Sequence, residues 1–134
     1  MRLSLRAGER IYINGAVIRV DRKVSLELMN DVVFLLEAHV LQPDDTGTPL
    51  RQLYFVLQAI LMDPRNAASV RALFDSVHAS TLASFANEAV IAGLRLVREQ
   101  VDAGRVFDAL RTIRGLFAIE AAILAVPSDR TQAA

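Results

Sequence analysis

Residues 10–19 read RIYINGAVIR, and the Asn14-Gly15 step at their centre is the strongest short signal for a β-hairpin in the chain. A two-residue turn of type I′ needs a positive φ at both central positions, which asparagine and glycine tolerate best. Apolar and polar residues alternate on both sides of the turn, as in a strand that buries one face. Because a two-residue loop also fixes the register, it places Arg10 directly opposite Arg19.

The same alternation extends outward from the hairpin over the first 36 residues. Leu3 and Leu5 alternate with polar residues before a break at Ala7-Gly8, and a further alternating stretch follows the hairpin. Residues 32–36 are continuously apolar and fit either a fifth strand or one buried helical turn. Residues 1–38 are therefore predicted to form an antiparallel β-meander of four or five short strands.

Helical patterns replace this alternation after a connection rich in proline, aspartate and glycine. Thr48-Pro49 is a helix start, since threonine caps well and proline suits the first helical position. Apolar spacing predicts helices over 49–62, from Pro64 to about residue 85, from Glu88 to near Gly104, and from Val106 to a stop at Pro127. The expected protein is α+β in one compact unit, with a β module over 1–38, a connection over 39–47, a helical region over 48–127 and a frayed tail over 128–134.

Composition narrows the class of protein. The 15 basic and 15 acidic residues cancel, so total charge indicates neither a nucleic acid nor a membrane as partner. The first 30 residues, however, carry six basic side chains against three acidic ones. The absence of cysteine excludes disulfides and thiolate sites and fits a reducing compartment, and no run reaches the roughly 18 apolar residues of a membrane span. We expect a cytoplasmic protein without a membrane partner.

Signatures of catalysis are missing from the sequence. It has no Gly-x-Ser-x-Gly, no phosphate loop, no dinucleotide fingerprint and no His-Glu-x-x-His. His39 and His78 have no second ligand at metal spacing, and are expected to be ordinary histidines. Asp44-Asp45 suits a hard cation or a turn, and its proline and glycine neighbours favour the turn. We expect no enzyme, no catalytic residue, no cofactor and no metal.

The arginines of the predicted strands are the most informative residues for function. Like charges at Arg10 and Arg19 repel each other, so this pair needs a carboxylate such as Glu9 or Glu27, or an external anion. Arg2, Ser4 and Arg6 are expected to share the same outward face, around the ring of Tyr12. Guanidinium groups pair with phosphates, and stacking of an unpaired base on an aromatic ring contributes about 1–3 kcal/mol. We therefore hypothesise that this face of the sheet binds RNA. The alternative is that it is the ordinary solvent-exposed face of an antiparallel sheet. The residues predicted to contact RNA are Arg2, Arg6, Arg10, Tyr12 and Arg19.

Two further features leave alternatives open. The helix over 49–62 is apolar nearly all round, so it lies either at the centre of a bundle or in a contact with another protein. Its residues Tyr54, Phe55 and Met62 suit a ligand pocket, but core packing is the favoured interpretation. The edges of so small a strand module need to be covered by helices or by a second copy, which makes a homodimer an expectation.

Several blocks, in order, resemble the flagellum biosynthesis repressor FlbT family: LSLRAGERIYINGAVI over 3–18, Leu53-Tyr54-Phe55, Met62-Asp63-Pro64, Ala103-Gly104 and ALRTIR over 109–114. The resemblance covers about residues 2–125. It implies a role in bacterial flagellum biogenesis, as a post-transcriptional repressor that binds the 5′ untranslated leader of flagellin messenger RNA, silences its translation and promotes its degradation. It also implies a small flagellar protein, FlaF, as a partner with the opposing effect.

The stretch Leu5-Arg6-Ala7-Gly8-Glu9 is also similar to the opening of the carbon storage regulator (CsrA) family, small β-dimers that bind GGA-containing leaders. There Arg6 matches an arginine of the RNA-binding edge, while Gly8 and Glu9 match the turn. That family's second arginine, on its last strand, has no equivalent here, so GGA specificity is not predicted. The alternative function is a protein-binding adaptor that senses flagellin or FlaF through its helical region and reaches RNA only indirectly.

Overall fold

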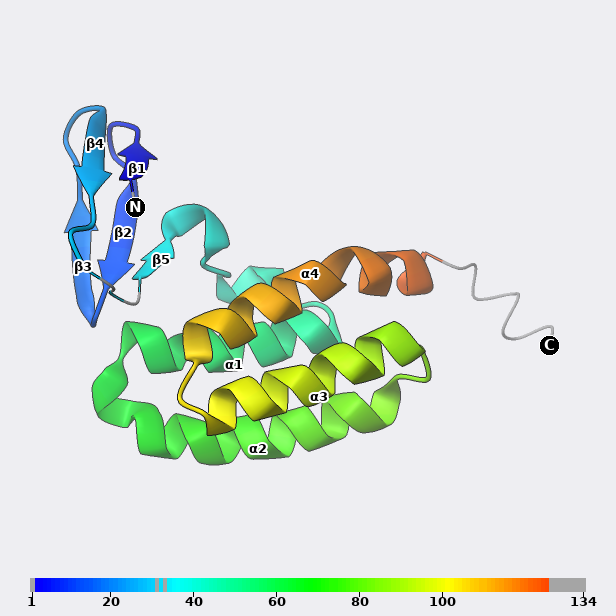
Figure 1. The fold of residues 1–134 in the computed structure, drawn as a ribbon. Coiled ribbons are helices and arrows are strands. Elements are labelled where there is room, and N and C mark those ends of the chain that lie inside the picture. Colours follow the sequence, from blue (N-terminus) through cyan, green and yellow to red (C-terminus); the bar gives the residue numbers. More distant parts are fainter. Residues whose placement is uncertain (1, 31, 33, 126–134) are drawn as a thin grey trace.

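The computed structural model describes residues 2–30, 32 and 34–125, and within them the chain is α+β, with short strands followed by helices (Figure 1). The strands are β1 (Arg2–Leu5), β2 (Arg10–Ile13), β3 (Ala16–Arg19), β4 (Val24–Glu27) and β5 (Phe34–Leu36). The helices are α1 (Pro49–Met62), α2 (Ala67–Ser84), α3 (Glu88–Asp102) and α4 (Val106–Leu124). Single turns of 3-10 helix lie at Glu37–His39, Pro43–Asp45 and Pro64–Asn66. The predicted fold class is confirmed.

The central hairpin forms as predicted. Asn14 and Gly15 have φ angles of 47° and 85°, the positive values that a type I′ turn requires. β2 and β3 pair in the predicted register, with Arg10 opposite Arg19. The apolar run that allowed two interpretations is a strand over Phe34–Leu36, which pairs with β2, whereas Val33 lies outside the described residues.

The order of the strands differs from the predicted meander. β1 pairs with β4, while β2 lies between β3 and β5, so the strands form two small sheets. Leu3 and Leu5 of β1 cluster with Ile11 and Phe34 of the other sheet, which means that the two sheets cover each other's apolar faces. The meander was wrong because alternation shows which face of a strand is buried, but not which strand lies beside it.

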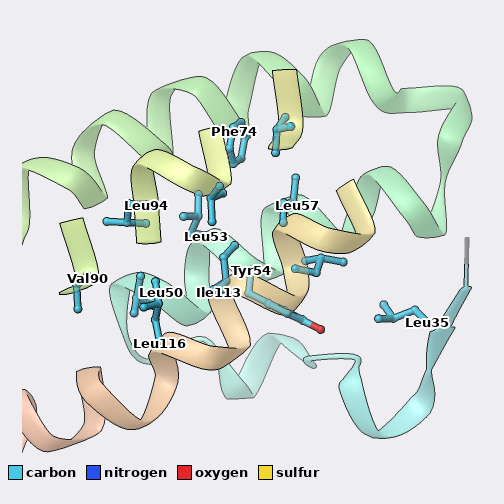
Figure 2. Packing of buried hydrophobic residues seen from close by; sticks show 14 residues of the cluster. Leu35, Leu50, Leu53, Tyr54, Leu57, Phe74, Val90, Leu94, Ile113 and Leu116 are labelled. Carbon is cyan, nitrogen blue, oxygen red and sulfur yellow. The ribbon is translucent and has the colours of Figure 1, made fainter. Parts of the chain in front are cut away.

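The helices enclose the larger core, in which α1 packs against α2, α4 and β2 (Figure 2). Leu50, Leu53, Tyr54 and Leu57 of α1 are fully buried, so this helix lies at the centre of its own bundle. Within this core the Tyr54 side chain points toward Leu35, a strand residue of the same cluster (Figure 2). The strand sheets and the helical bundle therefore share buried side chains.

The helix ends follow the capping signals closely. The Thr48 side chain accepts a hydrogen bond from the Arg51 N–H at 3.3 Å, and Asn87 accepts one from the Val90 N–H at 3.1 Å. α2 begins later than predicted, because Pro64–Asn66 forms a separate 3-10 turn. Of the helices described, none combines the length and apolar character needed to span a bilayer. The predicted stop at Pro127 and the tail over 128–134 lie outside the described residues.

Candidate nucleic-acid interface

The structure divides the predicted arginine face between two surfaces. Leu3 and Leu5 point into the cluster between the sheets, so Arg2, which alternates with them, points to the opposite side of β1, and the exposed Arg6 directly follows this strand. Tyr12 packs instead against the helical core, and Arg10 alternates onto that same side of β2. The division follows from the strand order, since β1 lies across the second sheet and does not extend it.

Carboxylates from the chain itself partner the arginines of the first surface. Arg2 donates to Glu27 Oε2 at 2.7 Å, across the β1–β4 pair. The Arg6 guanidinium lies 3.8 Å from Glu9 Oε1, while its side chain stays 87% exposed. The two acidic residues named as candidate partners of Arg10 and Arg19 are therefore paired with other arginines.

Arg10 and Arg19 lie opposite each other across the β2–β3 ladder, and no ion pair among the described residues offsets their like charges. In the described part of the chain, neither guanidinium forms an ion pair with a carboxylate. The carboxylate of Glu37 lies near, but it accepts from the backbone N–H of Arg10, at 3.4 Å. Like charges opposite each other in a sheet are destabilising by roughly a few tenths of a kcal/mol, so this pair suits an external anion.

Tyr12 lies beside Arg10 in the wall of a groove between β2 and α1, with a volume of about 370 Å³. Its ring is half-buried, so it is not the open stacking platform that the sequence predicted. The groove is also lined by Phe55, Gln58 and Met62 of α1, and by the segment from Val40 to Pro43. Tyr54 belongs to the core as favoured, whereas Phe55 and Met62 are half-buried and line this groove.

Buried polar side chains of α1 bind the segment that forms the groove wall opposite β2, which runs from Val40 to Pro43. The Gln58 amide accepts from the Leu41 N–H at 2.9 Å and donates to the Leu41 carbonyl at 2.7 Å. The Tyr54 hydroxyl donates to the His39 carbonyl at 2.6 Å and accepts from Arg114 at 2.8 Å. These bonds tie the connection after β5 to α1 and so place this wall of the groove against the helix.

The pKa values of Tyr54 and His39, which are joined by one of these hydrogen bonds, are both shifted. Burial raises the pKa of Tyr54, partly offset by Arg114, so the phenol keeps the proton that it donates. Burial and the positive charge of Arg114 lower the pKa of His39, which favours the neutral imidazole. Both side chains are therefore uncharged near neutral pH.

Sequence reasoning missed the groove, although a signal for it was present. Phe55, Gln58 and Met62 recur at helical spacing on one side of α1, and a glutamine in that row is unusual for a purely apolar helix face. What could not be foreseen is that the connection would fold back over these residues. This depends on bonds between Leu41 and Gln58, which lie 17 residues apart.

The remaining candidates are structural. Asp45 closes a capping box with Gln42, which confirms the turn interpretation of the aspartates. His78 is buried, and its Nε2 lies 2.7 Å from the Leu94 carbonyl, which links α2 to α3. Among the described residues, no three histidine, aspartate or glutamate side chains gather as a metal ion would require.

Comparison with known proteins covers almost the whole chain. The family described as "Flagellar protein FlbT" matches residues 1–124. The chain is 53% identical over 132 residues to the probable flagellum biosynthesis repressor protein FlbT of Chelativorans sp. (strain BNC1), which covers 98% of this chain and 91% of that protein. It is 56% identical to the protein of the same name from Rhizobium johnstonii, and this match covers 92% of the present chain and 83% of that protein. It is 55% identical to the protein of the same name from Brucella ovis, with 92% of the present chain and 82% of that protein covered. No solved structure matches the chain.

Proposed function

The chain belongs to the FlbT family of flagellar proteins, and on that premise we propose that it represses flagellin synthesis after transcription, by binding the 5′ untranslated leader of flagellin messenger RNA. Its relatives are named probable repressors of flagellum biosynthesis, which supports a regulatory role and not catalysis. The protein acts in the cytoplasm, where the leader meets the ribosome. Bound protein covers the leader, and the untranslated messenger is then degraded.

The observation that carries this proposal is the pair formed by Arg10 and Arg19. Arg10 and Arg19 lie directly opposite each other on neighbouring strands, and among the described residues no carboxylate forms an ion pair with either guanidinium. A phosphate between them removes the repulsion and gains charge-assisted hydrogen bonds. Arg2 and Arg6 contribute less under this proposal, because they lie on the other surface next to Glu27 and Glu9.

The groove beside Arg10 suits a base of a single-stranded segment. Tyr12 and Phe55 line it with aromatic surface, and Gln42 and Gln58 are the polar amide residues of its lining. Single-stranded RNA is recognised in this way, through phosphates held by arginine and unstacked bases placed against aromatic rings. The arrangement therefore supports contact with an unpaired region of the leader.

A binding measurement with purified protein and a fluorescently labelled flagellin leader tests direct contact. The anisotropy of the labelled leader should rise with protein alone, and an unlabelled leader should compete. Binding that appears only after FlaF or flagellin is added would reject direct contact.

The second candidate function, an adaptor for FlaF or flagellin, is favoured by one specific observation. Phe55, Met62 and Leu41 present half-buried apolar surface in the groove, and such a surface accepts an apolar segment of a partner protein. Under this alternative the protein reaches RNA only through that partner. Co-elution with FlaF or flagellin, without any shift of the naked leader, would support it.

A further inference from the structure

β3 differs from the other strands because all four of its residues are exposed. Val17 and Ile18 are 61% and 42% exposed, although both are apolar. Figure 1 shows β3 at the left margin of the strand region, on the far side of β2 from β5. β3 contains no proline, and Arg19 at its end is its one charged residue, so the strand has little of what commonly protects an edge from pairing. β5, at the opposite edge of the same sheet, buries Phe34 and Leu35.

The hairpin determines which backbone groups of β3 point to this open edge. In a two-residue type I′ hairpin the residues that flank the turn exchange hydrogen bonds, and bonded and non-bonded pairs then alternate along the ladder. The Val20 N–H donates to the Glu9 carbonyl at 3.1 Å, which continues the same alternation. The N–H and C=O groups of Val17 and Arg19 therefore point away from β2, toward the open edge.

This edge is complementary to itself in one antiparallel register. If Val17 lies opposite Arg19 of a second copy, two-fold symmetry places Arg19 opposite the second Val17, and all the outward-pointing groups of both residues are bonded. Ile18 then lies opposite Ile18 of the second copy, on the symmetry axis, where the apolar side chains cover each other. We propose that β3 pairs with β3 of a second copy in this register and joins the two three-stranded sheets into one.

The pairing has a consequence that rests on the proposed function. Arg10 and Arg19 of each copy lie on one surface of the joined sheet, and neighbouring strands are about 4.8 Å apart. The two pairs of arginines therefore form one cationic strip across the symmetry axis. A single RNA strand that follows this strip contacts both copies, so the second copy contributes residues to the same site.

The chain has no cysteine, so a single introduced cysteine reports the pairing without removal of any native thiol. Directly opposite residues of a non-hydrogen-bonded pair have Cα atoms about 4.5 Å apart, within the range that a disulfide spans. Ile18→Cys should therefore form a covalent dimer under mild oxidation. In the proposed register two Val17 residues are separated by two positions along the strands, roughly 8 Å, which is too far for a disulfide.

Val17→Cys is thus a matched control, since Val17 is the more exposed residue of the two. We expect Ile18→Cys to cross-link at least about ten times faster than Val17→Cys, because only its geometry suits a disulfide. Equal or faster cross-linking of Val17→Cys would overturn the register, and no covalent dimer of Ile18→Cys would overturn the pairing. Both readouts are taken without RNA, so they are independent of the proposed function.

A second variant separates loss of strand pairing from misfolding of the cysteine variant. Val17→Pro removes an outward-pointing N–H that no bond within the sheet uses, a position at which an edge strand tolerates proline. The double variant Ile18→Cys/Val17→Pro should keep the circular dichroism spectrum and lose the cross-link. Sedimentation of the unmodified chain should show a dimer that dissociates on dilution, and Val17→Pro should sediment as a monomer. A monomeric unmodified chain, or a strand of another protein found on β3, would overturn the proposal.

Discussion

The carboxylate of Glu120, near the end of α4, accepts a hydrogen bond from the backbone N–H of Leu50 at 2.8 Å, in the first turn of α1. Glu120 is only 1% exposed, and the two residues lie 70 positions apart. The first N–H groups of a helix have no partner within the helix, and its positive end attracts a negative charge. The last helix of the bundle thus caps the first.

Glu120→Ala is expected to destabilise the fold by about 1–3 kcal/mol, because it leaves the buried Leu50 N–H without an acceptor. Glu120→Gln keeps an acceptor oxygen at the same position and should cost less. Urea unfolding followed by circular dichroism measures both. Equal stability of Glu120→Ala and the unmodified chain would show that the cap contributes nothing.

Tyr54→Phe removes a single hydroxyl and leaves the His39 carbonyl and Arg114 without their shared partner. We expect a loss of about 1–3 kcal/mol in the free energy of unfolding. The same change should increase hydrogen exchange over residues 39–43, because the groove wall loses one of its anchors. Wild-type exchange rates in that segment would contradict the assignment of Tyr54 as an anchor.

Acid should weaken the fold in part through His39. Its pKa is lowered from the ordinary 6.5, so the folded state disfavours the charged imidazole. The stabilising contribution of the neutral ring is present above pH 6.5 and is lost as the pH falls through the lowered pKa. His39→Gln should flatten the decline in stability below pH 6.5, measured as the urea midpoint against pH. An unchanged decline would assign the effect to other groups.

Gly15→Ala tests the hairpin on which the strand region depends. Gly15 has a φ of 85°, and a Cβ there would lie 3.3 Å from the Pro64 side chain. We expect a loss of about 1 kcal/mol or more, since alanine rarely adopts a positive φ. Gly47→Ala is the control, because an added Cβ at that position meets no atom within 4 Å and its φ is not positive. Equal losses from both substitutions would exclude a special role for the turn.

The sequence predicted what depends on local chemistry. The Asn14-Gly15 turn, the register that it sets and the starts of α1 and α3 all follow from residues that are neighbours in the chain. The strand order and the groove were not predicted, because they depend on which apolar faces meet across long separations. The expected arginine face failed for the same reason: Arg2 and Tyr12 alternate correctly within their own strands, but these strands belong to different sheets.

The salt dependence of leader binding tests the central claim most directly. Each phosphate contact on a single strand contributes about −0.7 to the slope of log affinity against log salt, so Arg10→Ala/Arg19→Ala should make the slope shallower by about 1.4 per bound copy. The double variant should be no less stable than the unmodified chain, because it removes two like charges that face each other. Arg2→Ala, which acts on a neutralised arginine of the other surface, should leave the slope unchanged. A slope that stays the same in the double variant would contradict RNA binding through Arg10 and Arg19.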